Sequence, residues 1–323
     1  MTKKINLFIE YLLFALLIAL SLLITLSSQY ANATIDGIKL WFACVLPSLF
    51  PYLFITTILS SLSVTQKATK LLSPLTRAVY KVNGGVGYAF FISLLSGYPV
   101  GAKAVADLKE QGVITDTEAV RASILCSNSS PAFLVGSIGC FTFNNRAFGI
   151  TLFCLHLFSV LINGFIFSFY KRKEKPSQLA LKTQTETGGN LLYDGAYSSV
   201  ISVLVVGGLI TVFYILTEIL KGTGILTPLV SLLSTFIDEQ TAKAVVFGVV
   251  ECTRGLKQLS LGTTSNLQLP IALFLCGFGG VSVIAQSLAF LKKAKIKTAP
   301  FLLSKVTSAV IGFFIGVLFN IIF

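Results

Sequence analysis

Four short stretches of this sequence place glycine, proline, hydroxyl or charged residues inside runs that are otherwise apolar. They are SGYPVGAK (96–103), CSNSSP (126–131), ECTRGLK (251–257) and CGFGG (276–280). Glycine permits unusual dihedrals and proline removes an N–H donor, so we expect helices to break at these stretches. A break frees backbone N–H and C=O groups, which are tolerated at membrane depth only where protein, water or substrate satisfies them. The four stretches are therefore candidates for a binding site.

The chemistry predicted for these stretches is the binding of a small anion. The N-terminal end of a half-helix carries unpaired N–H donors and roughly +0.5 of a charge, which suits a carboxylate or phosphate. Charged residues within membrane segments suggest function by default. The candidate substrate-binding residues are Ser96, Gly97, Tyr98, Pro99, Gly101, Lys103, Asn128, Ser129, Ser130, Glu251, Thr253, Arg254, Gly255, Lys257, Gly277, Gly279, Gly280 and Ser282.

Structural explanations exist for several of these residues. Lys103 and Lys257 could simply extend to the membrane interface, and Glu251 could pair with Arg254 or Lys257. The glycines of CGFGG could form a helix-packing surface. The grouping of such residues in two symmetric places favours a binding site over separate packing features.

Enzymatic chemistry has no support in the sequence. There is no Walker loop, HExxH or GxSxG motif, and the six cysteines form no CxxC pair. The lone histidine, His156, lies in an apolar run without a neighbouring carboxylate, and we interpret it as packed and hydrogen-bonded. We expect no catalytic residue, metal or cofactor.

The composition predicts an all-α polytopic membrane protein. Hydrophobic residues make up 54% of the 323 residues, charged residues make up 12%, and the mean hydropathy is +0.84. Runs of about 20 apolar residues cross a bilayer as helices. The predicted spans are 8–27, 38–60, 119–141, 147–170, 195–220, 267–291 and 300–322, with interrupted stretches at 84–104 and 241–260 and interfacial helices at 65–82 and 222–238. A cleavage site at 31–33 is possible, but we favour a retained first helix.

The basic residues predict the topology rather than nucleic-acid binding. The net charge is +12, and lysine and arginine gather in segments 61–83, 171–190 and 292–298. The positive-inside rule places these segments and the N-terminus in the cytoplasm. This assignment is consistent only if 84–104 and 241–260 are re-entrant hairpins that enter the membrane from opposite sides.

Opposite hairpins suggest an inverted repeat. An offset of 154 residues carries Pro74 onto Pro228 (228 − 74), Gly101 onto Gly255 and Lys103 onto Lys257. Transporters with inverted repeats build their sites near the midplane from broken helices. The predicted organisation is an N-terminal transmembrane helix over 1–36, a first repeat over 37–170, a cytoplasmic linker over 171–194 and an inverted second repeat over 195–323.

The motifs LPSLFPYLF (46–54), LLSGYPVGAKAVADL (94–108), SNSSPAFLVGSIG (127–139) and CGFGGVSVIAQ (276–286) resemble those of the YlbJ family of sporulation integral membrane proteins. That family carries the nucleoside-recognition Gate domain and includes stage V sporulation protein V. The resemblance covers nearly the whole chain. Here NSSP stands where the family pattern has NNSGP, so the motif stays polar but loses its glycine.

The resemblance implies a core like that of the concentrative nucleoside transporters, with two opposed hairpins and two broken helices. It also implies a protein of the outer forespore membrane that moves dipicolinic acid during sporulation, and it suggests a homo-oligomer. The leading hypothesis is thus a transporter of a small anion, with a proton or sodium as the possible coupling ion. The alternatives are a nucleoside carrier, for which Glu251 and Asn128 could bind ribose, and a membrane scaffold of spore maturation that transports nothing.

Overall fold

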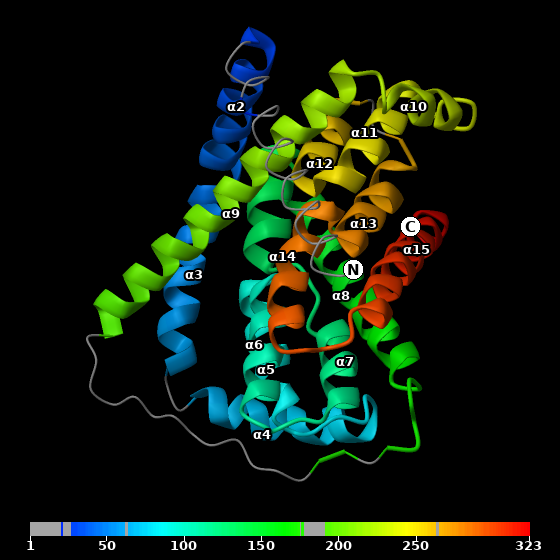
Figure 1. Ribbon diagram of the computed structural model, residues 1–323. Coiled ribbons are helices and arrows are strands. Elements are labelled where there is room, and N and C mark those ends of the chain that lie inside the picture. Colours follow the sequence, from blue (N-terminus) through cyan, green and yellow to red (C-terminus); the bar gives the residue numbers. More distant parts are fainter. Residues whose placement is uncertain (1–20, 22–26, 62–63, 175, 178–190, 263–264) are drawn as a thin grey trace, which may run out of the picture.

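A computed structural model describes the chain except for residues 1–20, 22–26, 62–63, 175, 178–190 and 263–264 (Figure 1). The described residues form helices and no strand. The N-terminus, all but two residues of the predicted span 8–27 and most of the predicted cytoplasmic linker lie outside the described residues. The all-helical fold class is confirmed for the part of the chain that the structure describes.

The first half begins with a long helical rod. It consists of α2 (Ser28–Leu40), the π-helical segment η1 (Trp41–Val45) and α3 (Leu46–Ser61). Both ends of η1 keep right-handed helical dihedrals, so the rod is continuous although Pro51 lies inside α3. The rod therefore crosses residue 36, the predicted boundary between the N-terminal helix and the first repeat.

A short helix, a hairpin and a broken helix complete the first half. They are α4 (Val64–Ala78), the hairpin of α5 (Val86–Ser96) and α6 (Val100–Glu110), α7 (Asp116–Leu125), the π-helical segment η2 (Ala132–Thr142) and α8 (Arg146–Phe167). A capping box between Thr115 and Glu118 begins α7. The helix stops at Cys126, so the predicted span 119–141 is broken into α7 and η2.

The second half repeats this plan. Its elements are α9 (Leu191–Gly222), α10 (Thr227–Leu233), the hairpin of α11 (Glu239–Val250) and α12 (Cys252–Ser260), the broken pair α13 (Gln268–Phe278) and α14 (Gly280–Lys293), and α15 (Ala299–Ile322). Each half thus reads as a span, a short helix, a hairpin, a broken helix and a last long helix.

Within the described residues, five stretches are long and apolar enough to cross a membrane. They are Ser28–Ile55, Arg146–Phe167, Leu192–Gly222, Gln268–Lys293 and Ala299–Ile322. They match the predicted spans 38–60, 147–170, 195–220, 267–291 and 300–322, and they confirm a multi-pass membrane protein. The side chains that point away from the neighbouring helices are largely apolar, as lipid contact requires; Phe158, Val212 and Phe314 are examples.

The basic segments gather at one end of the molecule. Arg121, in the middle of α7, donates hydrogen bonds to the carbonyl oxygens of Lys81, Tyr170 and Lys171, at 2.5–2.9 Å. Ile296, from the loop between α14 and α15, belongs to a buried apolar cluster with Tyr80 and Val82, against which Tyr170 packs. In Figure 1 this end is at the bottom, together with α4, whereas α10 is at the top. The described parts of the three basic segments therefore share one face, as the positive-inside rule requires.

The two hairpins point toward each other from opposite ends of the bundle. In Figure 1 the open end of α5–α6 faces the bottom and that of α11–α12 faces the top. Their tips, at residues 96–100 and 251–253, line one cavity. This antiparallel arrangement is the one that the inverted repeat predicts. That the hairpins re-enter the membrane without crossing it stays a prediction.

Candidate functional site

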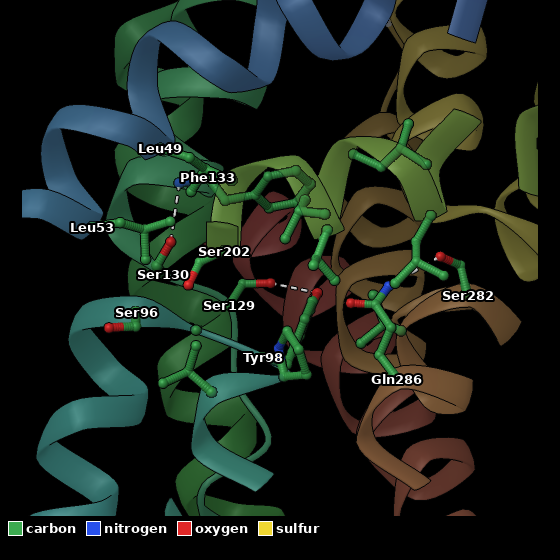
Figure 2. A pocket seen from close by; sticks show the side chains of 18 of the residues that line it. Leu49, Leu53, Ser96, Tyr98, Ser129, Ser130, Phe133, Ser202, Ser282 and Gln286 are labelled. Atoms are coloured by element: carbon green, nitrogen blue, oxygen red, sulfur yellow. Dashed lines mark hydrogen bonds between the residues drawn. The ribbon is translucent and has the colours of Figure 1, made fainter. Parts of the chain in front are cut away.

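A central cavity of about 410 Å³ lies where the hairpin tips and the broken helices meet. Its wall combines apolar side chains of α3, η2 and α9 with polar groups of both tips and of α14. Figure 2 shows Tyr98, Ser129, Ser130, Ser202, Ser282 and Gln286 around this space. The volume lies within the range of roughly 300–1,000 Å³ that is usual for small-molecule sites, as does the mixture of an apolar wall with few polar groups.

The tip of the first hairpin is positioned by glycine. Gly97 ends α5 with φ +74, a dihedral that L side chains rarely adopt. A Cβ on Gly97 would also lie 2.8 Å from the backbone nitrogen of Ser130. The next residue, Tyr98, donates its backbone N–H to the carbonyl of Asn128 at 2.8 Å. The tip is therefore joined to the break between α7 and η2 through backbone contacts.

Tyr98 also links the two halves of the molecule. Its hydroxyl accepts a hydrogen bond from Ser129 Oγ at 2.5 Å and donates one to the carbonyl of Cys276 at 3.4 Å. Ser129 belongs to the break after α7, and Cys276 lies near the end of α13. One side chain from the first hairpin thus contacts both broken helices beside the cavity.

Side chains satisfy the backbone that the first break releases. Ser129 donates its backbone N–H to Nε2 of His156 at 3.1 Å, and the histidine is buried. Asn128 Nδ2 donates to Ser93 Oγ at 3.2 Å, and Ser130 Oγ accepts from the backbone N–H of Phe133 at 3.3 Å. The interpretation of His156 as a packed, hydrogen-bonded residue is confirmed.

Charged side chains shape the second hairpin tip. Glu251 caps α12, because its Oε2 accepts from the backbone N–H of Arg254 at 2.6 Å. The guanidinium of Arg254 points instead to α9, where it donates to the carbonyl of Tyr214 at 2.8 Å and pairs with Glu218. It also stacks on the Tyr214 ring, 4.3 Å from its centre. Glu251 therefore contacts Arg254 through the main chain, and Arg254 anchors the hairpin to α9.

The break between α13 and α14 depends on two successive glycines. Gly279 and Gly280 have φ of +82 and +74. A Cβ on Gly280 would lie 2.9 Å from the backbone nitrogen of Cys252 and 3.1 Å from the carbonyl oxygen of Gly248, so it would collide with the second hairpin. Gly277 allows α15 to approach, since a Cβ there would lie 2.7 Å from the carbonyl oxygen of Ser308. In CGFGG, Gly280 thus allows the second hairpin to approach the break beside the cavity, whereas Gly277 allows α15 to pack against α13.

The structure brings ten of the candidate residues to the wall of the cavity. They are Ser96, Gly97, Tyr98, Pro99, Lys103, Ser129, Ser130, Glu251, Thr253 and Ser282. The other eight do not line the cavity: Gly101, Asn128, Arg254, Gly255, Lys257, Gly277, Gly279 and Gly280. Of the three cations proposed to attract an anion, only Lys103 lines the cavity.

Sequence reasoning missed the apolar wall and one buried cation. Leu49, Phe133 and Val205 contribute to the wall, and no local signal separates them from residues that face lipid. The cation is Lys305 of α15, which is 2% exposed and donates to Ser127 Oγ at 3.1 Å. Its signal was available, because a lone lysine inside the apolar run 300–322 is costly unless it has a function or a partner.

Known proteins resemble this chain both in sequence and in fold. No protein-family profile matches the chain. The chain is similar to the sporulation integral membrane protein YlbJ of Bacillus subtilis (strain 168), with 28% identity over 308 residues, which is 86% of this chain and 74% of the relative.

Among solved structures, a variant of CNTnw in the intermediate 3 state superposes with a TM-score of 0.61 and 12% identity, over 99% of this chain and 86% of that one. A doubly substituted CNTnw variant in an outward-facing state gives a TM-score of 0.60 and 14% identity, over 96% and 89% of the two chains. These are structures of a concentrative nucleoside transporter. The predicted likeness to the core of such transporters is confirmed at the level of the fold.

Proposed function

Because the chain belongs to the YlbJ family of sporulation integral membrane proteins, we propose that it moves a small organic anion across a membrane of the sporulating cell. The anion that we propose is dipicolinic acid, and the membrane is the outer forespore membrane. The observation that carries the transport function is the central cavity, which both hairpin tips and both broken helices border. The proposed role is that of a carrier and not of an enzyme.

The wall of the cavity suits a small, flat dianion. Its apolar faces, from α3 and α9, can pack against a ring, and its hydroxyl groups can donate to carboxylate oxygens. The hydroxyl groups that line the cavity are those of Ser96, Tyr98, Ser129, Ser130, Ser202, Thr253 and Ser282. Those of Tyr98, Ser129 and Ser202 donate to protein oxygens in this structure and would turn toward a bound carboxylate. The ammonium of Lys103 adds a positive charge at the edge of the cavity. Nothing in the wall identifies the pyridine ring, so this part of the proposal rests on the family alone.

The two half-helices that begin at the hairpin tips are not equivalent as anion sites. Glu251 already presents its carboxylate to the start of α12. The side chain before α6, by contrast, belongs to Pro99, which makes no capping hydrogen bond. We therefore place the substrate carboxylate nearer to the start of α6 and to Lys103 than to the start of α12.

A nucleoside is the second candidate, because Glu251, Ser129 and Gln286 line the cavity and could accept or donate hydrogen bonds to ribose. The topology proposed with either substrate has a cytoplasmic N-terminus, and the assembly proposed is a homo-oligomer.

Uptake by proteoliposomes tests the proposal. Purified full-length protein is reconstituted, and the uptake of labelled dipicolinate and labelled uridine is measured in parallel against protein-free vesicles. Saturable uptake of dipicolinate that uridine does not inhibit is the expected result. Uptake of uridine alone would replace the anion with a nucleoside, and uptake of neither would favour the scaffold.

A further inference from the structure

Lys305 lies near the start of α15, within the otherwise apolar stretch LLSKVTSAV (302–310). Hydrogen bonds from α8 hold the backbone on both sides of it. Asn163 Nδ2 donates to the carbonyl of Ser304 at 3.0 Å, and Ser159 Oγ donates to the carbonyl of Ser308 at 3.2 Å. The fold therefore fixes the direction in which this buried side chain extends.

The ammonium group of Lys305 reaches the place where three helices end. Its Nζ donates to Ser127 Oγ at 3.1 Å and lies 5.3 Å from the centre of the Tyr98 ring. A Cβ on Gly279 would be 3.6 Å from Nζ. Ser127 directly follows the C-cap of α7, Tyr98 lies between the C-cap of α5 and the N-cap of α6, and Gly279 is the C-cap of α13 and the N-cap of α14. The charge thus lies among three C-terminal helix ends.

These helix ends explain how the charge is tolerated without an acid. Among the described residues, no carboxylate lies within 4.0 Å of Lys305 Nζ. An isolated buried ammonium is strongly unfavourable. Each helix C-terminus carries roughly −0.5 of a charge, and the face of an aromatic ring also attracts a cation. The site therefore has the electrostatics of a cation site, and the lysine is the cation that occupies it.

In transporters built from broken helices, unwound carbonyls and the C-terminal ends of half-helices bind the coupling sodium or proton. We propose that the Lys305 ammonium is a tethered cation that replaces a free coupling cation at the junction of the broken helices, so that transport needs no sodium. A lysine ammonium suits this role because it is a compact monovalent point charge. The inference rests on the proposed transport function, and it assigns Lys305 a positioning role, since the side chain does not line the cavity.

Thermal stability tests this inference without any substrate. The melting temperature of the purified full-length protein is measured in sodium chloride and in choline chloride of equal ionic strength. We expect the same value in both salts for the wild type. In choline chloride, we expect Lys305→Ala to have a lower melting temperature than the wild type. Sodium chloride should raise the melting temperature of this variant, because a cation that binds only the folded state stabilises it. Lys292→Ala, at an exposed lysine of α14, is the matched control and should show no salt difference.

Two results would overturn the inference: sodium-dependent stabilisation of the wild type, or a Lys305→Ala protein that melts equally in both salts. If Lys305→Ala does not yield folded protein, Lys305→Ser replaces it, because serine removes the charge, leaves space for a sodium ion and adds an oxygen that can bind it. The same two results then decide. The wild-type comparison is available in either case.

Uptake provides the second measurement. Wild-type vesicles should accumulate substrate equally in sodium and in choline. Lys305→Ala should lose about tenfold to hundredfold in choline, the loss expected for one charge-assisted hydrogen bond, and sodium or methylammonium should restore part of it. Wild-type uptake that requires sodium would contradict the tethered cation. Failure of the wild type to take up dipicolinate or uridine in any salt would overturn the proposed function, whereas the melting comparison would still decide the role of Lys305.

Discussion

The first hairpin, α5 and α6, is held at the cavity by backbone contacts, whereas charged side chains hold the second hairpin, α11 and α12. At the first tip, the backbone of Tyr98 binds the carbonyl of Asn128, and Gly97 lies against Ser130. At the second tip, Glu251 caps α12, and Arg254 pairs with Glu218 of α9. The two hairpins run in opposite directions and both border the cavity, but backbone contacts position the first and charged side chains position the second.

Positions that the repeat makes equivalent show the same contrast. A Cβ on Gly101 would lie 2.0 Å from the carbonyl oxygen of Cys126, in the first broken helix. A Cβ on its counterpart Gly255 would lie 2.2 Å from the Cα of Gly248, inside its own hairpin. Lys103 lines the cavity, and its counterpart Lys257 does not. The repeat therefore preserves backbone geometry, while each half places its side-chain chemistry differently.

The largest expected difference between the hairpins is the side of the membrane from which each is accessible. In a protein with its native cysteines replaced, Gln111→Cys reports the open end of the first hairpin and Leu261→Cys that of the second; both positions are exposed. We expect a membrane-impermeant thiol reagent to label them from opposite sides, with Gln111 on the side of Lys173→Cys. Labelling of both hairpins from the same side would exclude the inverted arrangement.

Glycine substitution should separate backbone contact from side-chain anchoring. Gly101→Leu should abolish uptake while membrane insertion is kept, because the side chain would push α6 away from the carbonyl of Cys126. Gly280→Leu should act in the same way at the second hairpin. Gly208→Leu is the control, since a Cβ at this exposed position of α9 meets no atom within 4 Å. Normal uptake by a well-expressed Gly101→Leu protein would count against a site at the first tip.

Removal of the charged anchor should destabilise the protein rather than weaken substrate binding. Taking one partner from a buried ion pair costs about 3–5 kcal/mol of unfolding free energy, and the Arg254 and Glu218 side chains are only 8% and 13% exposed. We expect a clearly lower melting temperature for Arg254→Gln, and a cost for the double variant with Glu218→Gln that is below the sum of the single costs. Lys243→Gln removes an exposed pair with Glu239 and should cost no more than about 1 kcal/mol. An Arg254→Gln protein as stable as Lys243→Gln would show that the anchor is unimportant.

The smallest expected effect distinguishes the two equivalent lysines. Lys103→Gln should weaken dipicolinate binding by up to about tenfold, because Lys103 lines the cavity but is exposed, so that solvent partly screens its charge. Lys257→Gln should bind as the wild type does. Titration of the purified variants with dipicolinate measures both affinities. Equal affinities for the two variants and the wild type would mean that an anion is held by hydroxyl groups and helix ends alone.

The sequence by itself determined the local features of this protein. The spans follow from the length of apolar runs, and the breaks at SGYP, CSNSSP and CGFGG follow from glycine and proline, whose effects act within a few residues. The charge distribution predicted that the three basic segments share one face, because short loops can be compared without knowledge of packing. The order of elements in the two halves could also be predicted, because it follows from the positions of the apolar runs and breaks along the sequence.

Only the tertiary structure decided which side chains meet at the centre. Tyr98 reaches the carbonyl of Cys276, and Lys305 reaches Ser127, each across 178 residues of chain. Arg254 was expected beside an anion, but it turns to Glu218, because its place on α12 faces α9 and not the cavity. Such contacts depend on how helices that are distant in the chain rotate and pack against one another. The periodicity and spacing of residues within one segment do not predict this packing.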